Sequence, residues 1–280
     1  MKRSRVLVTG ASGFLGRYVC SKLSACDYEV IQLSSADGCI ADPKTLENIG
    51  KIEFVIHLAG ILSVEDSWKN PQYYNQINVN GTVNVLNLCR KYDAEIIYCS
   101  SYVYGIPQVL PISENHPTFP TNPYMLSKLM AEHICRMYHE RYGLKCKIIR
   151  PFNVYGPGQS KKLLLGSIIS QVDKSRSVSI RNWKTRRDFV HVSDLADAVK
   201  LSLISQSDFE IFNIGSGIST SVLKILKIIE ELKGNSIKYI ESDTNFVDPI
   251  VDCYADITCA KTKLNWKPKI NLRQGLEELL

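Results

Sequence analysis

The sequence predicts an α/β protein, with a doubly wound parallel sheet in its first half and a smaller, mostly helical lobe towards its C-terminus. Two observations lead to this fold class. Short apolar segments alternate with helical ones, and most of the apolar segments lack the polar–apolar alternation of a half-exposed strand. The 280 residues, 45% hydrophobic and 22% charged, can bury a sizeable core, and this composition excludes wholesale disorder.

The predicted elements follow in chain order, with apolar runs read as strands and apolar residues at helical spacing read as helices. We expect strands at Val6–Val8, Glu29–Leu33, Phe54–Leu58, Glu95–Cys99 and Lys145–Ile149. We expect helices at Phe14–Ser24, Asn78–Lys91 and Tyr124–Tyr142, and later at Asp194–Ile204, Ser221–Leu232 and Gln274–Leu280. The chain shows no internal repeat, which argues against a solenoid.

Charge and cysteine usage narrow the class of protein. The net charge of +6 is small and dispersed, so it suits a protein that handles an anionic small molecule rather than a nucleic acid. The nine cysteines form no Cys-x-x-Cys pair, so we predict reduced thiols and neither a metal site nor a disulfide framework. The first residues contain no signal-like apolar run, and the apolar stretch Phe54–Leu62 is too short to span a bilayer. We therefore expect a cytoplasmic protein without membrane contact.

A glycine-rich loop, Thr9–Gly16, joins the first predicted strand to the first predicted helix. Its glycines, Gly10, Gly13 and Gly16, allow backbone to approach a pyrophosphate, and the helix N-terminus supplies free N–H groups. The alternative is a tight turn that binds nothing. We predict a dinucleotide-binding domain in residues 1–154, to which the segment of about 188–215 returns, and a substrate-binding lobe in 155–187 and 216–280.

Two further motifs supply reactive side chains. Tyr124 and Lys128 lie four residues apart at the start of a predicted helix and so share one face, where an ammonium can lower the pKa of a phenol. Ser100 follows the strand before them, at the strand end where open α/β sheets bind ligands. Taken alone, the Tyr124–Lys128 pair is as typical of a solvated helix face as of a catalytic site, and Ser100 is more typical of a turn residue or a helix cap. Their order and spacing together favour a catalytic group.

With these motifs, the chain resembles the NAD(P)-dependent nucleotide-sugar epimerase, dehydratase and reductase family of extended short-chain dehydrogenases/reductases. The resemblance extends through His57–Gly60, Asn78–Thr82, Arg150–Gly158, Arg187–Asp194, Phe212–Gly215 and Leu264–Pro268. It implies a Rossmann-type sheet, with Tyr124 as general acid/base, Lys128 on the nicotinamide ribose and Ser100 polarising the reacting oxygen.

The resemblance also implies the binding residues. Cofactor contacts are expected from Thr9, Gly10, Ser12, Gly13, Phe14, Leu15, Gly16, Arg17, Ser34, Ser35, Asp42, Leu58, Ala59, Gly60, Asn78, Tyr124, Lys128, Pro151, Asn153 and Val154. Contacts with a nucleotide-sugar substrate are expected from Ser100, Ser101, Tyr102, Asn153 and Arg187. For Tyr102 the alternative is simple packing, and for Arg187 it is a solvated basic loop.

Two departures from the family pattern refine these expectations. Dehydratases carry Asp and Glu where this chain has Ser101 and Tyr102, so we do not expect 4,6-dehydration. NAD-preferring members end the second strand with an acidic residue, but this chain has Ser34 and Ser35. We therefore favour NADP(H), with Arg17 after the glycine loop as a candidate partner for its 2′-phosphate, and NAD(H) as the alternative. The family's adenine-contacting Asp aligns with Cys39, between Asp37 and Asp42, and which of these lies near adenine stays open.

The expected activity is NAD(P)H-dependent reduction of the 4-keto group of a nucleotide-activated 6-deoxy sugar, of the dTDP-4-keto-6-deoxyglucose type, for surface polysaccharide. The first alternative is a nucleotide-sugar 4-epimerase with tightly bound NAD. The second is a non-catalytic NAD(P)-sensing protein, although such proteins typically lose the tyrosine or the lysine. The resemblance further implies a homodimer that packs through the helices at 78–91 and 124–142.

Overall fold

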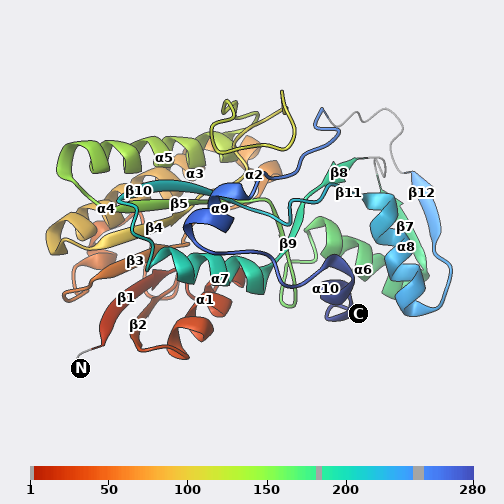
Figure 1. The fold of residues 1–280 in the computed structure, drawn as a ribbon, viewed down its shortest axis with the longest axis horizontal. Coiled ribbons are helices and arrows are strands. Elements are labelled where there is room, and N and C mark those ends of the chain that lie inside the picture. Colours follow the sequence, from red (N-terminus) through yellow and green to blue (C-terminus); the bar gives the residue numbers. More distant parts are fainter. Residues whose placement is uncertain (1–2, 181–184, 242–248) are drawn as a thin grey trace.

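The computed structural model describes residues 3–180, 185–241 and 249–280, and its centre is a six-stranded parallel sheet (Figure 1). The strands run in the order β10-β5-β4-β3-β1-β2. Their bounds are β1 Ser4–Thr9, β2 Tyr28–Leu33, β3 Phe54–His57, β4 Glu95–Cys99, β5 Cys146–Pro151 and β10 Phe209–Ile214. The strand order reverses between β1 and β3, and open α/β sheets bind ligands beyond the carboxyl ends of the strands at such a point.

Helices cover both faces of the sheet, as the alternating pattern predicts. On one face lie α1 (Phe14–Ser24) and α7 (Val192–Ser202), which pack on each other, and on the other lie α4 (Gly81–Tyr92) and α5 (Pro123–Tyr142) (Figure 1). Burial of both faces explains why the strands are continuously apolar. The predicted doubly wound parallel sheet is therefore confirmed.

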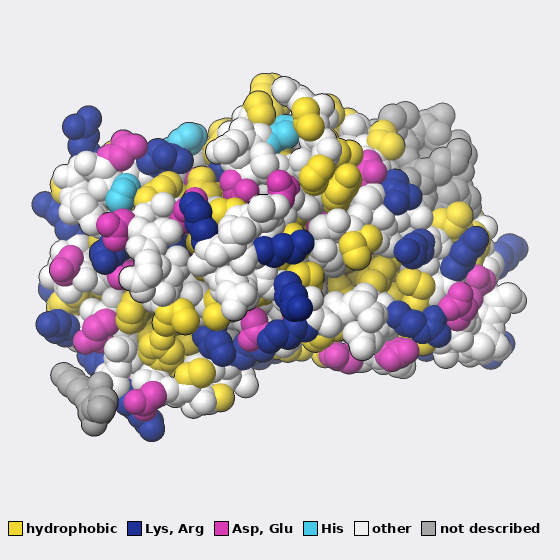
Figure 2. All heavy atoms as spheres, in the orientation of Figure 1, with side chains coloured by type: hydrophobic (Ala, Val, Ile, Leu, Met, Phe, Trp, Pro, Cys, Tyr) yellow, Lys and Arg dark blue, Asp and Glu magenta, His cyan; other side chains and the backbone are white. Residues whose placement is uncertain are grey.

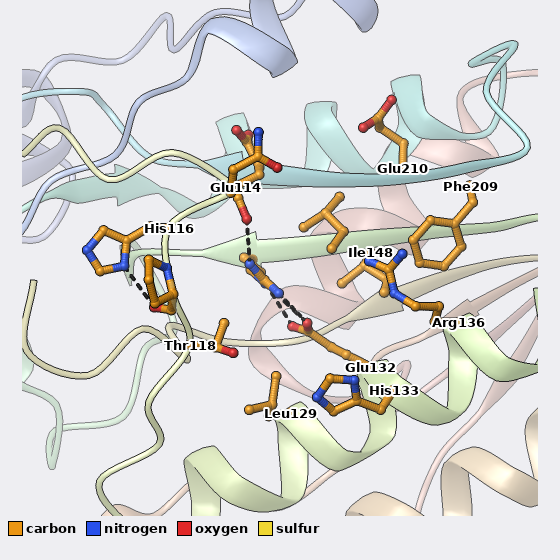
Figure 3. Close-up of a pocket in the computed structure, with 14 residues that line it drawn as sticks. Glu114, His116, Thr118, Leu129, Glu132, His133, Arg136, Ile148, Phe209 and Glu210 are labelled. Carbon is orange, nitrogen blue, oxygen red and sulfur yellow. Dashed lines mark hydrogen bonds and ion pairs between the residues drawn. The ribbon is translucent and has the colours of Figure 1, made fainter. Parts of the chain in front are cut away.

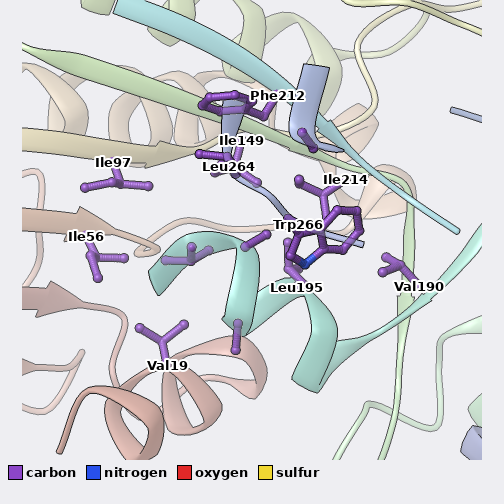
Figure 4. Packing of buried hydrophobic residues seen from close by; sticks show 14 of the residues in the cluster. Val19, Ile56, Ile97, Ile149, Val190, Leu195, Phe212, Ile214, Leu264 and Trp266 are labelled. Atoms are coloured by element: carbon purple, nitrogen blue, oxygen red, sulfur yellow. The ribbon is translucent and has the colours of Figure 1, made fainter. Parts of the chain in front are cut away.

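The core on the α1–α7 face draws on the whole length of the chain. Val19 of α1, Ile56 of β3 and Leu195 of α7 meet Leu264 and Trp266 there (Figure 4). The Trp266 Nε1–H also donates to the Asp194 carbonyl at 2.9 Å, and α9 (Thr258–Lys263) lies against β10. Residues from Cys253 to Trp266, which we expected in the C-terminal lobe, thus pack on the central sheet.

Short helices connect β3 to α4 and differ from the prediction. They are α2 (Val64–Lys69), α3 (Pro71–Tyr74) and a π-helical turn η2 (Asn75–Asn80) that runs directly into α4. The Ser63 and Asn70 side chains accept hydrogen bonds from the first turns of α2 and α3 and so cap both helices. The helix that we expected to begin at Asn78 therefore begins upstream, and Asn78 lies in the π-helical turn.

The second lobe contains more strand than we expected. Its helices are α6 (Leu164–Ser175), α8 (Val222–Lys233) and α10 (Leu272–Glu277), and they share one apolar cluster. Three strand pairs accompany them: β6 (Asn153–Tyr155) with β9 (Phe189–His191), β7 (Ser177–Ile180) with β12 (Lys238–Glu241), and β8 (Arg186–Arg187) with β11 (Thr220–Ser221). Each strand is four residues or shorter and pairs with a segment far along the chain, so local patterning does not predict it.

The surface mixes charges of both signs on the face that Figure 2 shows, and hydrophobic side chains gather where the segment between β4 and α5 crosses its upper edge. Ile106, Val109 and Phe119 of that segment are more than half exposed. Within the described residues, no helix combines the length and apolarity needed to cross a membrane. No disulfide joins any of the nine cysteines, all of which lie in the described part of the chain.

Candidate active site

The carboxyl ends of β1 and β3 are joined by a buried chain of hydrogen bonds. Thr9 Oγ1 lies 2.7 Å from His57 Nδ1, and His57 Nε2 lies 3.1 Å from Thr82 Oγ1. Thr9 Oγ1 also accepts from the Ala59 backbone N–H at 3.2 Å. Burial, followed by the nearby Lys128 charge, lowers the pKa of His57 to about 3, so this ring is neutral at physiological pH. His57 therefore positions the two strand ends as a hydrogen-bonding spacer.

The glycine loop fits tightly against the segment that follows β3. Gly10 has φ = +70°, and a Cβ added to it would lie 2.7 Å from the Ala59 nitrogen, so only glycine fits there. Gly13 caps α1 without any side-chain hydrogen bond from the described residues, which leaves first-turn N–H groups available. Together with the helix dipole, this arrangement fits a dinucleotide pyrophosphate.

Asn78 connects the cofactor-binding segments to the catalytic helix. Its Oδ1 accepts from the Ile61 N–H at 2.9 Å, and its Nδ2 donates to the Ile61 carbonyl at 3.1 Å and to Ser127 Oγ at 2.9 Å. A Cβ added to Gly60 would lie 2.9 Å from Asn78 Oδ1 and 3.8 Å from Lys128 Nζ. Gly60, Asn78 and Lys128 therefore form one neighbourhood, as the resemblance implies.

Tyr124 and Lys128 project from the first turns of α5 into buried surroundings. Asn122 caps the helix by accepting from the Met125 N–H at 2.9 Å, which fixes the position of Tyr124. The Tyr124 ring meets Tyr74 edge to face at 6.4 Å between centroids. Lys128 is 3% exposed, and its Nζ lies 4.6 Å from the centre of the Tyr98 ring. The motif is thus a buried pair and not a solvated helix face.

The sequence predicts that Lys128 lowers the pKa of Tyr124, but in the structure the pKa of Tyr124 is raised. Burial raises the pKa of Tyr124, although a hydrogen bond with the Ser101 side chain acts in the opposite direction. Burial also lowers the pKa of Lys128, while the nearby Cys99 and Glu132 act in the opposite direction. Desolvation of the phenolate is the largest effect on the pKa of Tyr124, and the expected lowering by Lys128 is not among its causes. Tyr124 is therefore protonated at neutral pH in this structure.

Ser100 lies directly beyond β4, where its N–H donates to the Ile149 carbonyl at 2.8 Å. The residue is 4% exposed, and its Oγ has no hydrogen-bond partner among the described residues. The hydroxyl of Tyr98 is also buried and has no hydrogen-bond partner among the described residues. A buried hydroxyl without a partner is costly, so an oxygen of a bound ligand is the natural partner for Ser100.

Three of the residues expected to bind substrate have protein contacts of their own: Tyr102 after β4, Asn153 at the start of β6 and Arg187 in β8. The Tyr102 hydroxyl donates to the Gly105 carbonyl at 2.6 Å, and its ring meets Phe152 edge to face, which supports the packing alternative. Asn153 Nδ2 donates to the Asp188 carbonyl at 3.1 Å. Arg187 Nη1 donates to the Ile250 carbonyl at 2.7 Å, so Arg187 also joins the second lobe to the segment after residue 248.

Several residues from the expected cofactor set have other contacts. Arg17, considered for a 2′-phosphate, donates to the Gly158 carbonyl at 3.4 Å. Asp42 caps the short 3₁₀ helix η1 (Pro43–Leu46) by accepting from the Lys44 N–H. Ser34 donates from both its N–H and its hydroxyl to the carboxylate of Asp37, while Ser35 is exposed.

The sequence left the position of Asp37 open. Its spacing from Ser34, typical of a side-chain-closed turn, is the signal that could have located it.

A cavity of about 410 Å³ lies away from this site, between α5, the β5–β10 edge and the segment near Glu114 (Figure 3). Two of its charged groups, Arg150 and Glu132, are paired with each other. Arg150 donates to Glu132 at 2.6 Å and to the Glu114 carbonyl at 3.3 Å. None of the predicted catalytic residues lines this cavity, so we assign it no role in the chemistry.

Comparisons with known proteins show the family to which the chain is similar. Residues 6–215 match the family model described as "NAD dependent epimerase/dehydratase family". The chain is 36% identical to a putative UDP-glucose 4-epimerase of Methanocaldococcus jannaschii, over 98% of this chain and 97% of that protein. These findings bear out the resemblance that the motifs indicated.

Solved structures show the same fold. A UDP-glucose 4-epimerase of Thermotoga maritima with UDP-glucose superposes with a TM-score of 0.90, at 29% identity, over 98% of this chain and 96% of that one. The RMD protein of Pseudomonas aeruginosa with NADPH gives 0.87, at 26% identity, over 99% and 98%. The names of the Methanocaldococcus jannaschii and Thermotoga maritima proteins favour the epimerase alternative over the 4-keto reductase that we expected. The chain is an enzyme of the extended short-chain dehydrogenase/reductase type and belongs to the NAD dependent epimerase/dehydratase family.

Proposed function

We propose that this protein is a nucleotide-sugar 4-epimerase that acts on a UDP-hexose with bound NAD. The observation that carries the proposal is the buried, unpartnered hydroxyl of Ser100 at the end of β4, next to the helix that begins with Tyr124 and Lys128. Two relatives that align with nearly the whole chain carry the name UDP-glucose 4-epimerase, one of them as a putative enzyme, which supports the choice of reaction and nucleotide.

The cofactor would lie across the carboxyl ends of β1 and β3. The glycine loop, with Thr9, Ser12, Phe14 and Leu15, would hold the pyrophosphate, and Leu58, Ala59 and Gly60 would contact the cofactor from the end of β3. Asn78 holds the segment after β3 through Ile61, and Pro151 and Val154 would contact the nicotinamide half. When bound, NAD would accept a hydride from the sugar C4 and return it to the opposite face.

The side chains of this site would manage the proton and the oxygen. Tyr124 would take the proton of the sugar 4-hydroxyl and later give it back, so no proton is consumed. Lys128 would bind the nicotinamide ribose, and its charge would favour the Tyr124 phenolate that burial disfavours. Ser100 would donate to the 4-oxygen as it becomes a carbonyl.

The neighbours of Ser100 support epimerisation over dehydration. β-Elimination of water needs a further acid and base, and Ser101 and Tyr102 lack carboxylates. Ser101 forms a hydrogen bond with Tyr124 instead, and would help to orient the phenol. Tyr102 bonds to Gly105 and would shape the pocket wall.

The nucleotide diphosphate would be held by the second lobe, formed by 155–187 and by 216–280 without the Cys253–Trp266 segment that packs on the central sheet, against the cofactor domain of 1–154 and about 188–215. Asn153 and Arg187 are the proposed contacts with the diphosphate. The planar guanidinium of Arg187, which also donates to the carbonyls of Arg186 and Ile250, has the geometry for paired hydrogen bonds to phosphate oxygens.

A homodimer would use the outer face of α5. Leu126, Met130 and Met137 are about two-fifths exposed and, with His133, follow helical spacing along one stripe. Leu129 is buried within the protomer and does not belong to the stripe. Packing of α4 and α5 around a two-fold axis would cover this surface.

The test is a product assay with the full chain and no added cofactor. Incubation with UDP-glucose or UDP-N-acetylglucosamine should give the 4-epimer at equilibrium, and denatured enzyme should release NAD. Stoichiometric oxidation of added NADPH or NADH by a dTDP-4-keto-6-deoxy sugar, without epimerisation of any UDP-hexose, would instead establish the reductase.

A further inference from the structure

We propose that Asp37 makes this enzyme selective for NAD(H) over NADP(H), by supplying a carboxylate to the adenosine ribose from the turn after β2. The proposal rests on the cofactor role proposed above and adds a specificity residue to it. It reverses the preference for NADP(H) that we expected from Ser34 and Ser35. That expectation considered only the residues at the end of β2.

The geometry of the turn brings the carboxylate back to the strand end. Ser34 donates to Asp37 Oδ2 from its backbone N–H and from its hydroxyl, each at 2.8 Å. The Asp37 N–H in turn donates to the Ser34 carbonyl at 3.1 Å, which closes a four-residue turn. The sequence has a serine at position 34, where NAD-preferring members carry an acidic residue. The turn brings the carboxylate of Asp37 next to this serine.

This turn lies next to the glycine loop and is fixed from both sides. The Leu33 carbonyl, at the end of β2, accepts from the Ala11 N–H at 3.1 Å. Beyond the turn, Ile40 is buried, and its carbonyl accepts from Asn84 Nδ2 of α4 at 3.1 Å. The position of Asp37 is therefore set by β1, β2 and α4, at the edge of the predicted pyrophosphate site.

The charges near this turn favour a ribose hydroxyl over a phosphate. The hydrogen bonds from Ser34 lower the pKa of Asp37, so the group is ionised at neutral pH. Both bonds from Ser34 go to Oδ2, so Oδ1 can accept a hydrogen bond from a ribose hydroxyl. A 2′-phosphate would meet this negative charge, and the Ser34 hydroxyl that we expected to accommodate it is already donated to Asp37. Arg17, the expected cationic partner, donates to Gly158.

The experiment measures the Kd values of NAD⁺ and NADP⁺ by calorimetry on the full chain, after removal of co-purified nucleotide. Wild type should bind NAD⁺ more tightly than NADP⁺. Asp37→Asn should lower that preference about tenfold, because it removes the charge while keeping the size of the side chain. Ser34→Ala should lower the preference for NAD⁺ by a smaller factor, because the Asp37 carboxylate loses one of its two hydrogen bonds from Ser34.

The matched control is Glu47→Gln, which removes an exposed carboxylate that follows η1 in the same β2–β3 connection and is not among the expected cofactor contacts. It should leave the NAD⁺ to NADP⁺ ratio at the wild-type value. A wild-type preference for NADP⁺, an unchanged ratio in Asp37→Asn, or a changed ratio in Glu47→Gln would each overturn the role of Asp37. Failure of wild type to bind either nucleotide would contradict the proposed function itself, so the two failures are distinguishable.

Discussion

Two groups of buried polar side chains flank β4 and β5, and they differ in whether their hydrogen bonds are complete. In the Arg150 cluster, Arg150 donates to Glu132 and to the Tyr104 hydroxyl, and Tyr104 donates to Asn213. Asn213 Nδ2 then donates to the Ile112 carbonyl at 2.9 Å. In the site at the end of β4, Ser100 Oγ and the Tyr98 hydroxyl have no partner among the residues that the structure describes.

The difference shows that burial of polar groups does not by itself identify an active site. A saturated cluster such as that of Arg150 fixes how elements pack, whereas hydroxyls left without partners indicate a place for a ligand. Substitutions in the two groups should therefore separate activity from stability, and the following predictions are ordered from the largest expected effect to the smallest.

Tyr124→Phe should reduce kcat for epimerisation by about 10⁴-fold, because the site loses the group that exchanges a proton with the sugar hydroxyl. The free energy of unfolding should change by less than about 1 kcal/mol, since the ring and its contact with Tyr74 remain. Steady-state kinetics and urea unfolding of the same preparation check both. A kcat within tenfold of wild type would remove Tyr124 from the mechanism.

Glu132→Leu should lower the free energy of unfolding and leave kcat nearly unchanged, which is the reverse of Tyr124→Phe. It leaves the Arg150 guanidinium buried without its carboxylate, which should lower the free energy of unfolding by about 4 kcal/mol. At a temperature where the variant is folded, kcat should stay within a few-fold of wild type. Loss of kcat in a variant of wild-type stability would show that the saturated cluster also serves the chemistry.

Ser100→Ala should reduce kcat by about 10²-fold, because one donor to the developing carbonyl oxygen is lost. The stability should not fall, because the hydroxyl has no protein partner to lose among the described residues. Thermal unfolding and kinetics measure the two effects. Ser100→Thr, which keeps the hydroxyl, is the matched control, and a loss of stability in Ser100→Ala would contradict the unpartnered state of Ser100.

His57 should make a contribution to stability that depends on pH. Its folded pKa is about 3, below the ordinary value of 6.5, so between these values the unfolded chain binds a proton that the folded chain excludes. The contribution is complete above pH 6.5 and is lost at about 1.4 kcal/mol per pH unit as the pH falls towards 3. Urea unfolding of wild type and His57→Gln from pH 7 to 4 should show a shallower dependence in the variant, and equal slopes would contradict it.

The sequence predicted those parts of the fold and site that local patterns encode. The limits of α1 and β4, the glycine loop and the spacing of Tyr124 and Lys128 all follow from periodicity and neighbouring residues. Features made by contacts between distant segments were not predicted. The β7–β12 pair joins Ser177 to Lys238, and the Arg150–Glu132 pair joins a strand to the helix before it. The Asp37 turn is local, but its importance depends on the hydrogen bonds of Ser34.

The central claim is that the site at the end of β4 inverts the sugar C4 by removing and returning the same hydride. The direct measurement uses UDP-glucose that carries deuterium at C4, with the full chain, no added cofactor and mass spectrometry of the separated epimers. We predict a 4-epimer that retains the deuterium and takes up no hydrogen at C4 from water. Loss of the label to solvent, or no epimer together with one-to-one oxidation of reduced nicotinamide by a keto-sugar, would contradict it.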